Sequence, residues 1–155
     1  MDSSDLQNYI DEHRIDAGIL PLDQHTPTVG DAARALGVDT DQIIKSLIFQ
    51  VNDQPLLVIN NGLKRVDRKK LAACLGVGRK KVKFADPDMA LITTGFIVGS
   101  MPPFGHKTRL RTLVDEAVTE LAVIYGGGGD INAMMRLTPA VLLSVTNAEI
   151  TSLSE

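Results

Sequence analysis

The sequence of 155 residues is poor in aromatic side chains and in cysteine. It has no tryptophan, two tyrosines and four phenylalanines, so no platform for stacking successive nucleobases is evident. Its one cysteine, Cys74, excludes an intramolecular disulfide and is typical of a reducing compartment. No apolar run approaches the roughly 20 residues of a membrane span, and the acidic N-terminus lacks the apolar core of a signal peptide. We therefore expect a cytoplasmic protein with a single domain over residues 1–155.

Several catalytic motifs are also missing. There is no G-x-S-x-G elbow, and the run GGGGD lacks the Lys-Ser/Thr pair of a phosphate-binding Walker loop. His13, His25 and His106 have neither the spacing nor the cysteine partners of a metal site, so we expect no metal and no cofactor. Cys74 falls on the apolar stripe of an expected helix with no histidine nearby in sequence, which favours a core cysteine over a nucleophile.

The expected elements alternate hairpins with short helices, which indicates an α+β fold with a mixed, mostly antiparallel sheet. The segment 43–51 is the clearest strand, and it forms a hairpin with 55–60. Thr28 begins a helix that Gly37 ends. The other expected helices cover 4–14, 67–76, 86–93 and a last segment from Thr138, and the other expected strands cover 18–22, 81–84, 111–114, 121–125 and 134–137.

The net charge is −3, but the basic residues are concentrated. Residues 1–63 carry ten acids and three bases, whereas 64–83 carry nine bases and one acid. Lys107, Arg109 and Arg111 add three more bases. Such a cluster predicts a footprint for a polyanion, and a solvated face that balances acidic neighbours is the other interpretation.

The stretch 93–107, TTGFIVGSMPPFGHK, opens as an expected apolar strand and continues as backbone with little side chain. Glycine permits positive φ and close approach, and proline fixes φ. The N–H groups of Gly99, Ser100 and Met101 are then presented at one place. A rigid connecting loop and an oxyanion or small-molecule site both fit this stretch.

Lys45 lies in the strand 43–51 with the parity of the apolar residues Leu47 and Phe49, so it shares their face. It either reaches water at the strand end or lines a pocket. Backbone donors, a lysine and a basic patch, without a visible nucleophile or base, suit hydrolysis of an already activated ester. The four-glycine run at 126–129 is either a backbone nest, a site of close approach to a ligand, or a plain loop.

Five ordered segments together resemble the YbaK/ProX-like aminoacyl-tRNA editing family. The resemblance runs from about residue 26 to the C-terminus. The segments are TVGDAARALGV at 28–38, QIIKSLIF at 42–49, RVDRKKLA at 65–72, TGFIVGSMPPFGH at 94–106 and LTPAVLL at 137–143.

The resemblance implies a barrel-like editing-domain fold with short flanking helices, and trans-editing hydrolysis of mischarged aminoacyl-tRNA. The substrate would carry a small amino acid such as alanine or cysteine on tRNA for proline, and prolyl-tRNA synthetase is a candidate partner. Lys45 matches the family's strand lysine, and Gly99 to Pro103 matches its G-x-x-x-P motif. Gly99 and its neighbours would bind the ester carbonyl and position water, and a terminal tRNA hydroxyl would assist.

Site residues follow from this match. The catalytic set is Lys45, Gly99 and Ser100. Ser46 would tune amino-acid choice, and the substrate-binding set is Ser46, Met101, Pro103, His106 and Gly127. The acceptor end would bind Lys64, Arg65, Arg68, Lys69, Lys80 and Lys81.

Two departures from the family pattern leave undetermined which amino acid is removed from the tRNA. Ser100 stands where members that remove cysteine often have a second glycine, and Tyr125-Gly126-Gly127 replaces a Ser-x-Gly pattern. An inactive tRNA-binding or synthetase-associated module, and a hydrolase acting on a small ester not carried by RNA, are the alternatives.

Overall fold

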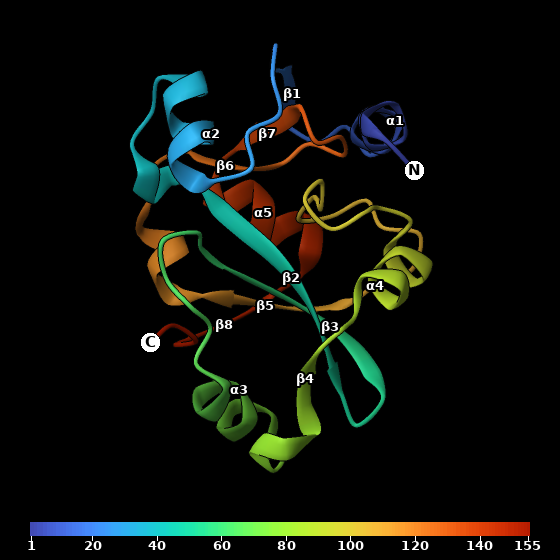
Figure 1. Cartoon of the computed structure of the whole chain (residues 1–155), viewed down its shortest axis with the longest axis vertical. Coiled ribbons are helices and arrows are strands. Elements are labelled where there is room, and N and C mark those ends of the chain that lie inside the picture. The colour runs from blue at the N-terminus through green and yellow to red at the C-terminus, as the bar shows by residue number, and fades with distance from the viewer.

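The computed structural model describes residues 1–155 and confirms the α+β class. Two sheets lie side by side (Figure 1). The helices are α1 (Ser3–Glu12), α2 (Val29–Leu36), α3 (Arg68–Leu75), α4 (Pro87–Thr94) and α5 (Pro139–Thr146). The strands are β1 (Gly18–Pro21), β2 (Ile44–Val51), β3 (Gln54–Asn61), β4 (Val82–Phe84), β5 (Arg111–Asp115), β6 (Ile124–Gly127), β7 (Ala133–Leu137) and β8 (Glu149–Thr151). Short 3₁₀ segments are η1 (Thr40–Gln42), η2 (Arg79–Lys81) and η3 (Glu116–Glu120).

The five-stranded sheet has the order β4-β2-β3-β5-β8, and the three-stranded sheet has the order β1-β7-β6. Pairing is antiparallel except at β3–β5 and β5–β8, which are parallel. A parallel bridge between Ile43 and Tyr125 connects the two sheets. The sheets do not close into a barrel, so the barrel-like expectation is wrong: β4 and β8 remain edges of the larger sheet.

Local chemistry explains most element boundaries. Thr28 caps α2 by accepting the Asp31 N–H, and Gly37 ends the helix in the left-handed region. The hairpin between β2 and β3 turns on Asn52 and Asp53, both with positive φ, as its right-handed twist requires. Asp2 caps α1, because its carboxylate accepts the Ser4 and Asp5 N–H groups.

Two sequence expectations fail locally. The segment 93–98 is not a strand: α4 continues to Thr94, and Gly95 ends it with φ +83°. Cys74 is exposed and does not lie in the core, because only Leu71 and Ala72 of α3 are buried. The strand β8 was not expected at all; it pairs with β5 over three residues.

The core has two main parts on opposite faces of β2. Ile44 and Ile48 pack between the sheets with Phe96 and Leu142, and Phe49 packs toward α3. The alternation of β2 thus sends Lys45 to the α3 face, as the sequence predicted, and Ser46 to the face between the sheets. No helix has the length and apolar character to cross a membrane.

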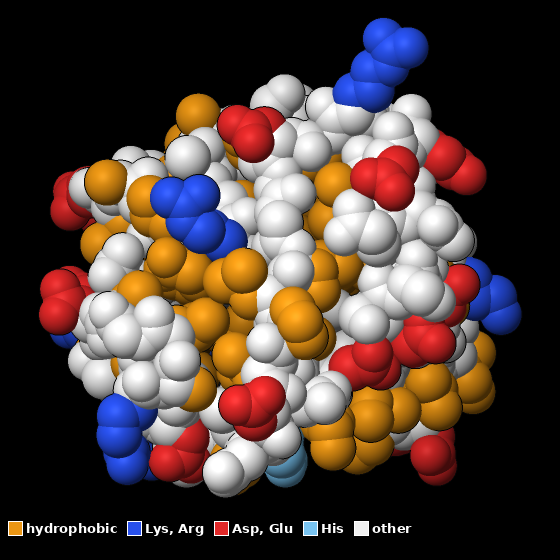
Figure 2. Space-filling model, turned by 90° about the horizontal axis from the view of Figure 1, so that it is seen from above, with side chains coloured by type: hydrophobic (Ala, Val, Ile, Leu, Met, Phe, Trp, Pro, Cys, Tyr) orange, Lys and Arg blue, Asp and Glu red, His pale blue; other side chains and the backbone are white.

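Charge separates along the molecule. Figure 2 looks onto the end formed by α1, α2 and the three-stranded sheet, and acidic side chains are spread over that face. The basic segment 64–83 forms α3, η2 and β4 at the other end (Figure 1). The strand β2 begins beside α2 and runs toward β4, and Lys45 is its second residue.

Candidate functional site: an apolar pocket beside a basic groove

A cavity of about 370 Å³ lies where β2, the 98–101 loop and β6 meet. Five residues singled out from the sequence line it together: Lys45, Ser46, Gly99, Met101 and Gly127. The rest of its wall is mainly apolar and comes from the segment before α2, from α2, from β2 and the residue before it, from β4 with Ala85, from α4, from the loop after α4 and from β7. These residues are Thr26, Pro27, Thr28, Val29, Ala32, Ile43, Ile44, Leu47, Ile48, Phe84, Ala85, Ala90, Val98 and Met134.

Lys45 is the one charged residue in the wall of this pocket. Its side chain is exposed and forms no hydrogen bond or ion pair within the chain. No carboxylate, histidine or cysteine lines the cavity, so its wall offers no general base and no activated thiol. A free ammonium at the mouth of an apolar pocket suits an anionic group or a polarised carbonyl oxygen.

The loop 99–103 provides backbone donors, although fewer than predicted. The Ser100 N–H donates to the Ile97 carbonyl at 3.1 Å, so it is already used. The N–H groups of Gly99 and Met101 have no partner within the chain. Gly99 has φ +97° and open space where a Cβ would stand, so its backbone is accessible from the cavity.

Ser100 itself faces away from the pocket. Its side chain is 1% exposed, and its hydroxyl donates to the Ile97 carbonyl at 2.9 Å. Its carbonyl accepts the Gly129 N–H at 3.0 Å. The geometry therefore gives Ser100 the task of fixing the loop, not direct contact with a ligand in the cavity.

The glycine run explains how the loop is held. A Cβ at Gly127 would overlap the Met101 carbonyl oxygen and stand 2.9 Å from the Ser100 oxygen. The close approach at this run is therefore between two backbone segments of the protein, which was not the ligand approach considered from the sequence. A glycine is required at 127 because both groups in contact are main chain and neither can rotate away.

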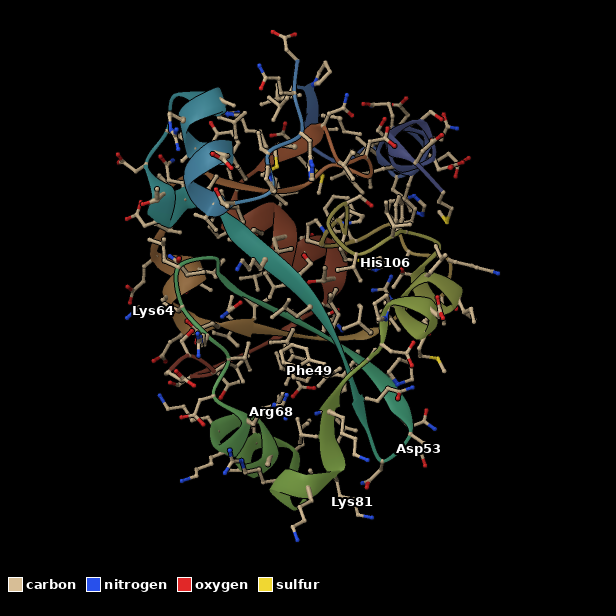
Figure 3. The ribbon with its side chains drawn as sticks, viewed as in Figure 1. Phe49, Asp53, Lys64, Arg68, Lys81 and His106 are labelled. Atoms are coloured by element: carbon tan, nitrogen blue, oxygen red, sulfur yellow. The ribbon has the colours of Figure 1, made fainter.

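Pro103 and His106 also support the loop from behind and do not line the cavity. Pro103 packs beside Gly126. The His106 Nε2 donates to the Pro102 carbonyl at 2.7 Å, and the ring lies edge-on to Phe96. Burial lowers the pKa of His106 to about 4, so the ring is neutral at pH 7. Figure 3 shows His106 near α4, on the loop.

Ser46 places an unsatisfied group at the pocket. Its Oγ is buried and has no hydrogen-bond partner. A buried hydroxyl without a partner is unfavourable by about 1–3 kcal/mol, and such groups are uncommon in folded proteins.

A basic groove adjoins the pocket and shares Lys45, Leu47 and Phe84 with it. Five further cations line it, and none of them forms an ion pair: Lys64, Arg65, Arg68, Lys69 and Arg79. Of its two acids, Asp67 caps α3 and Glu155 ends the chain. Unpaired cations in one groove repel one another and favour an anionic ligand.

The remaining predicted bases lie elsewhere. Lys80 and Lys81 lie in η2 with Arg79 but, unlike Arg79, do not line the groove. In Figure 3, Lys81 is near the bottom of the molecule and Lys64 is at mid-height, with Arg68 between them in this view. Arg111 is paired with Glu149 through two contacts of 3.0 Å. The site residue that sequence reasoning missed is Phe84, whose signal was an apolar residue at the end of a short strand, directly after Lys83 and close to the bases of η2.

Comparison with known proteins identifies the family. The model of the aminoacyl-tRNA editing domain matches residues 23–145. A relative from Bacillus subtilis (strain 168), the uncharacterized protein YwhH, is 28% identical over 80% of this chain and 78% of its own. Proline–tRNA ligase of Thermoanaerobacter sp. (strain X514) is 25% identical over 72% of this chain, but the match spans only 20% of the ligase.

Comparison with solved structures supports the same family. A candidate trans-editing enzyme for prolyl tRNA synthetase superposes with TM-score 0.90 at 30% identity, covering 99% of this chain and 96% of that one. The hypothetical protein APE2540 superposes with TM-score 0.89 at 28% identity, covering 97% and 99%. The matched region contains the pocket, the loop and the groove-lining helix, and the chain belongs to the family of aminoacyl-tRNA editing domains.

Proposed function

We propose that this protein hydrolyses the ester bond of mischarged aminoacyl-tRNA that carries a small amino acid, acting in trans. The observation that carries the proposal is the composition of the pocket: one free ammonium, two free backbone N–H groups and no protein base. An aminoacyl ester is an activated bond with a neighbouring ribose hydroxyl. It needs chiefly a positioned water and a stabilised oxyanion.

In this mechanism the ester carbonyl oxygen lies against the Gly99 and Met101 N–H groups, and Lys45 stabilises the charge that develops or binds the adjacent phosphate. Water adds to the carbonyl carbon while the neighbouring ribose hydroxyl relays a proton: it takes one from the water as it passes its own to the leaving ribose oxygen. The ester C–O bond then breaks, so the water oxygen ends in the carboxyl group of the amino acid and the relayed proton on the ribose oxygen. The products are the free amino acid and tRNA without an amino acid.

The substrate we propose is alanine or cysteine on tRNA for proline, with prolyl-tRNA synthetase as the partner in the cytoplasm. The relatives named as proline–tRNA ligases support the tRNA identity. The apolar wall supports a small, weakly polar amino acid, since a charged side chain would lose its hydration there. Ser46 is the polar group in the wall that we expect to tune the choice.

The test is deacylation of alanyl-, cysteinyl- and seryl-tRNA by the wild type, Lys45→Ala and, as control, Lys83→Ala. Lys83 is exposed on β4 and does not line the pocket. We expect Lys45→Ala to lower kcat/KM on the order of a hundredfold, the effect of removing one electrostatic stabiliser, and Lys83→Ala to match the wild type.

Unchanged hydrolysis by Lys45→Ala would remove that lysine from the mechanism. Absence of turnover on all three substrates, combined with salt-dependent RNA binding, would instead assign an inactive tRNA-binding module. Turnover of small esters with salt-insensitive affinity would assign a hydrolase whose substrate is not RNA.

A further inference from the structure

We propose that Phe84 is a stacking platform for a nucleobase near the acceptor end of the RNA, placed between the ester pocket and the phosphate-binding groove. The inference rests on the proposed function and adds a residue that neither the family resemblance nor the sequence assigned. Phe84 ends the edge strand β4, and its side chain is 51% exposed.

The position of Phe84 distinguishes it from other exposed apolar residues. It lines both the apolar pocket and the basic groove, together with Lys45 and Leu47. A ligand that extends from the pocket into the groove passes this ring. Single exposed apolar side chains are common on proteins and need no explanation, but this one stands at the boundary between two cavities of different chemistry.

The ring is fixed before any ligand binds. Phe84 pairs in register with Phe49 of β2, and the two rings stack with centroids 4.4 Å apart and planes 27° apart. Phe49 is fully buried and forms part of the core toward α3. Binding to a ring held in this way loses little side-chain entropy, which is the advantage of a preorganised contact.

Arg68 lies against the stacked pair of Phe49 and Phe84 rings, over the ring of Phe84. Its guanidinium carbon lies 5.0 Å from the Phe84 ring centroid, and Figure 3 shows Arg68 on the α3 side of Phe49. Both an aromatic ring and a guanidinium plane stack on nucleobases, and the guanidinium also binds phosphate. Arg68 is exposed and unpaired, so it can move from the ring to the RNA.

These features specify a ligand with three parts in order: an acyl group, a base and a chain of phosphates. The acyl group enters the pocket, a base lies against Phe84, and the phosphates face Lys64, Arg65, Lys69 and Arg79 in the groove. A single-stranded RNA end matches this order. A small ester would fill the pocket and leave the cations of the groove without a contact.

The experiment measures binding of an RNA hairpin that has a single-stranded 3′ acceptor end and no attached amino acid. The proteins compared are the wild type, Phe84→Ala, Phe84→Leu and Phe84→Trp. One base stack predicts that Phe84→Ala and Phe84→Leu weaken Kd about tenfold, whereas Phe84→Trp retains it. Ile92→Ala is the matched control, since Ile92 is an exposed apolar residue on α4 that lines neither cavity. Thermal unfolding of each variant checks the fold.

Variants that remove one lysine charge test, in the same assay, whether the groove binds phosphates. Lys69→Gln should reduce the slope of log Kd against log salt by about 0.7, the value for one phosphate contact of a single strand. Lys83→Gln, outside the groove, should leave the slope unchanged. Equal affinity of the wild type, Phe84→Ala and Phe84→Leu would overturn the inference, as would loss of binding in Phe84→Trp with the fold intact.

The two proposals fail in different ways. If Phe84 affects RNA affinity but no charged tRNA is hydrolysed, the stacking role stands and the deacylase function falls. If tRNA is hydrolysed and Phe84→Ala changes neither Kd nor KM, the function stands and the stacking role falls.

Discussion

The pocket and the groove recognise ligands by different means. The pocket is built from main chain: its donors are backbone N–H groups, and its position depends on a loop clamped against a glycine run. The groove is built from long, exposed, unpaired cations on α3 and its flanks. Backbone donors are fixed and few, so each contributes strongly, whereas flexible surface charges contribute individually little and are screened by salt.

This contrast predicts where the chain tolerates change. A methyl group added at the backbone contact should be more damaging than the loss of a whole charged side chain in the groove. Substitutions in the pocket should alter kcat, because they move groups that act in the transition state. Substitutions in the groove should alter affinity and its salt dependence and leave the chemical step intact.

The largest effect is expected from Gly127→Ala. The added Cβ would overlap the Met101 carbonyl oxygen, so the 99–103 loop must move and the Gly99 and Met101 donors move with it. Displacing both donors should lower kcat/KM for deacylation on the order of a thousandfold. Steady-state deacylation measures this directly, with Gly18→Ala as control because a Cβ there meets nothing within 4 Å.

Wild-type activity in Gly127→Ala would remove the loop from the mechanism. A variant that retains its salt-dependent RNA affinity but loses turnover would support the separation of pocket and groove.

Local chemistry made much of this molecule predictable from sequence. Thr28, Asp67 and Thr138 cap the helices that they were expected to begin, and Gly37 and Gly76 end theirs with positive φ. The alternation along β2 also indicated the face of Lys45. These signals depend on a few adjacent residues, which is why a single sequence contains them.

Features set by distant contacts were not predictable. The apolar run at 96–98 gave no sign that Gly95 would end a helix and exclude a strand. Parallel pairing of β5 with β3 and β8 depends on segments far apart in the chain. The role of Gly127 became visible only from the Met101 and Ser100 carbonyls beside it, and the position of Phe84 only from the two cavities that it joins.

A second, smaller effect concerns acid pH. Burial lowers the pKa of His106 to about 4 from its ordinary 6.5, so between these values the unfolded chain binds the proton and the folded one does not. Stability from this group is therefore full above pH 6.5 and is lost as pH falls toward 4, by on the order of 3 kcal/mol. Urea unfolding at pH 7 and pH 5 should show a smaller difference in His106→Gln than in the wild type.

The control for this effect is His25→Gln, because His25 is exposed on the segment before α2. Identical pH dependence in the wild type and His106→Gln would contradict the burial argument. The effect also sharpens the contrast between the two regions, since acid should weaken the loop behind the pocket and leave the cations of the groove charged.

The smallest effect is expected from Ser46→Ala. The Ser46 Oγ is buried without a partner, so its removal deletes an unfavourable group and should leave stability unchanged or raise it by about 1 kcal/mol. The pocket wall becomes more apolar, so hydrolysis of alanyl-tRNA should be retained while that of seryl-tRNA falls. Deacylation of the two substrates in competition measures the ratio of their kcat/KM values.

A loss of stability above 1 kcal/mol would mean that the hydroxyl has a partner in solution, and an unchanged ratio would mean that Ser46 does not contact the amino acid. The unchanged ratio would leave selection to the backbone of the loop, which would make the pocket still more dependent on main chain than the groove is.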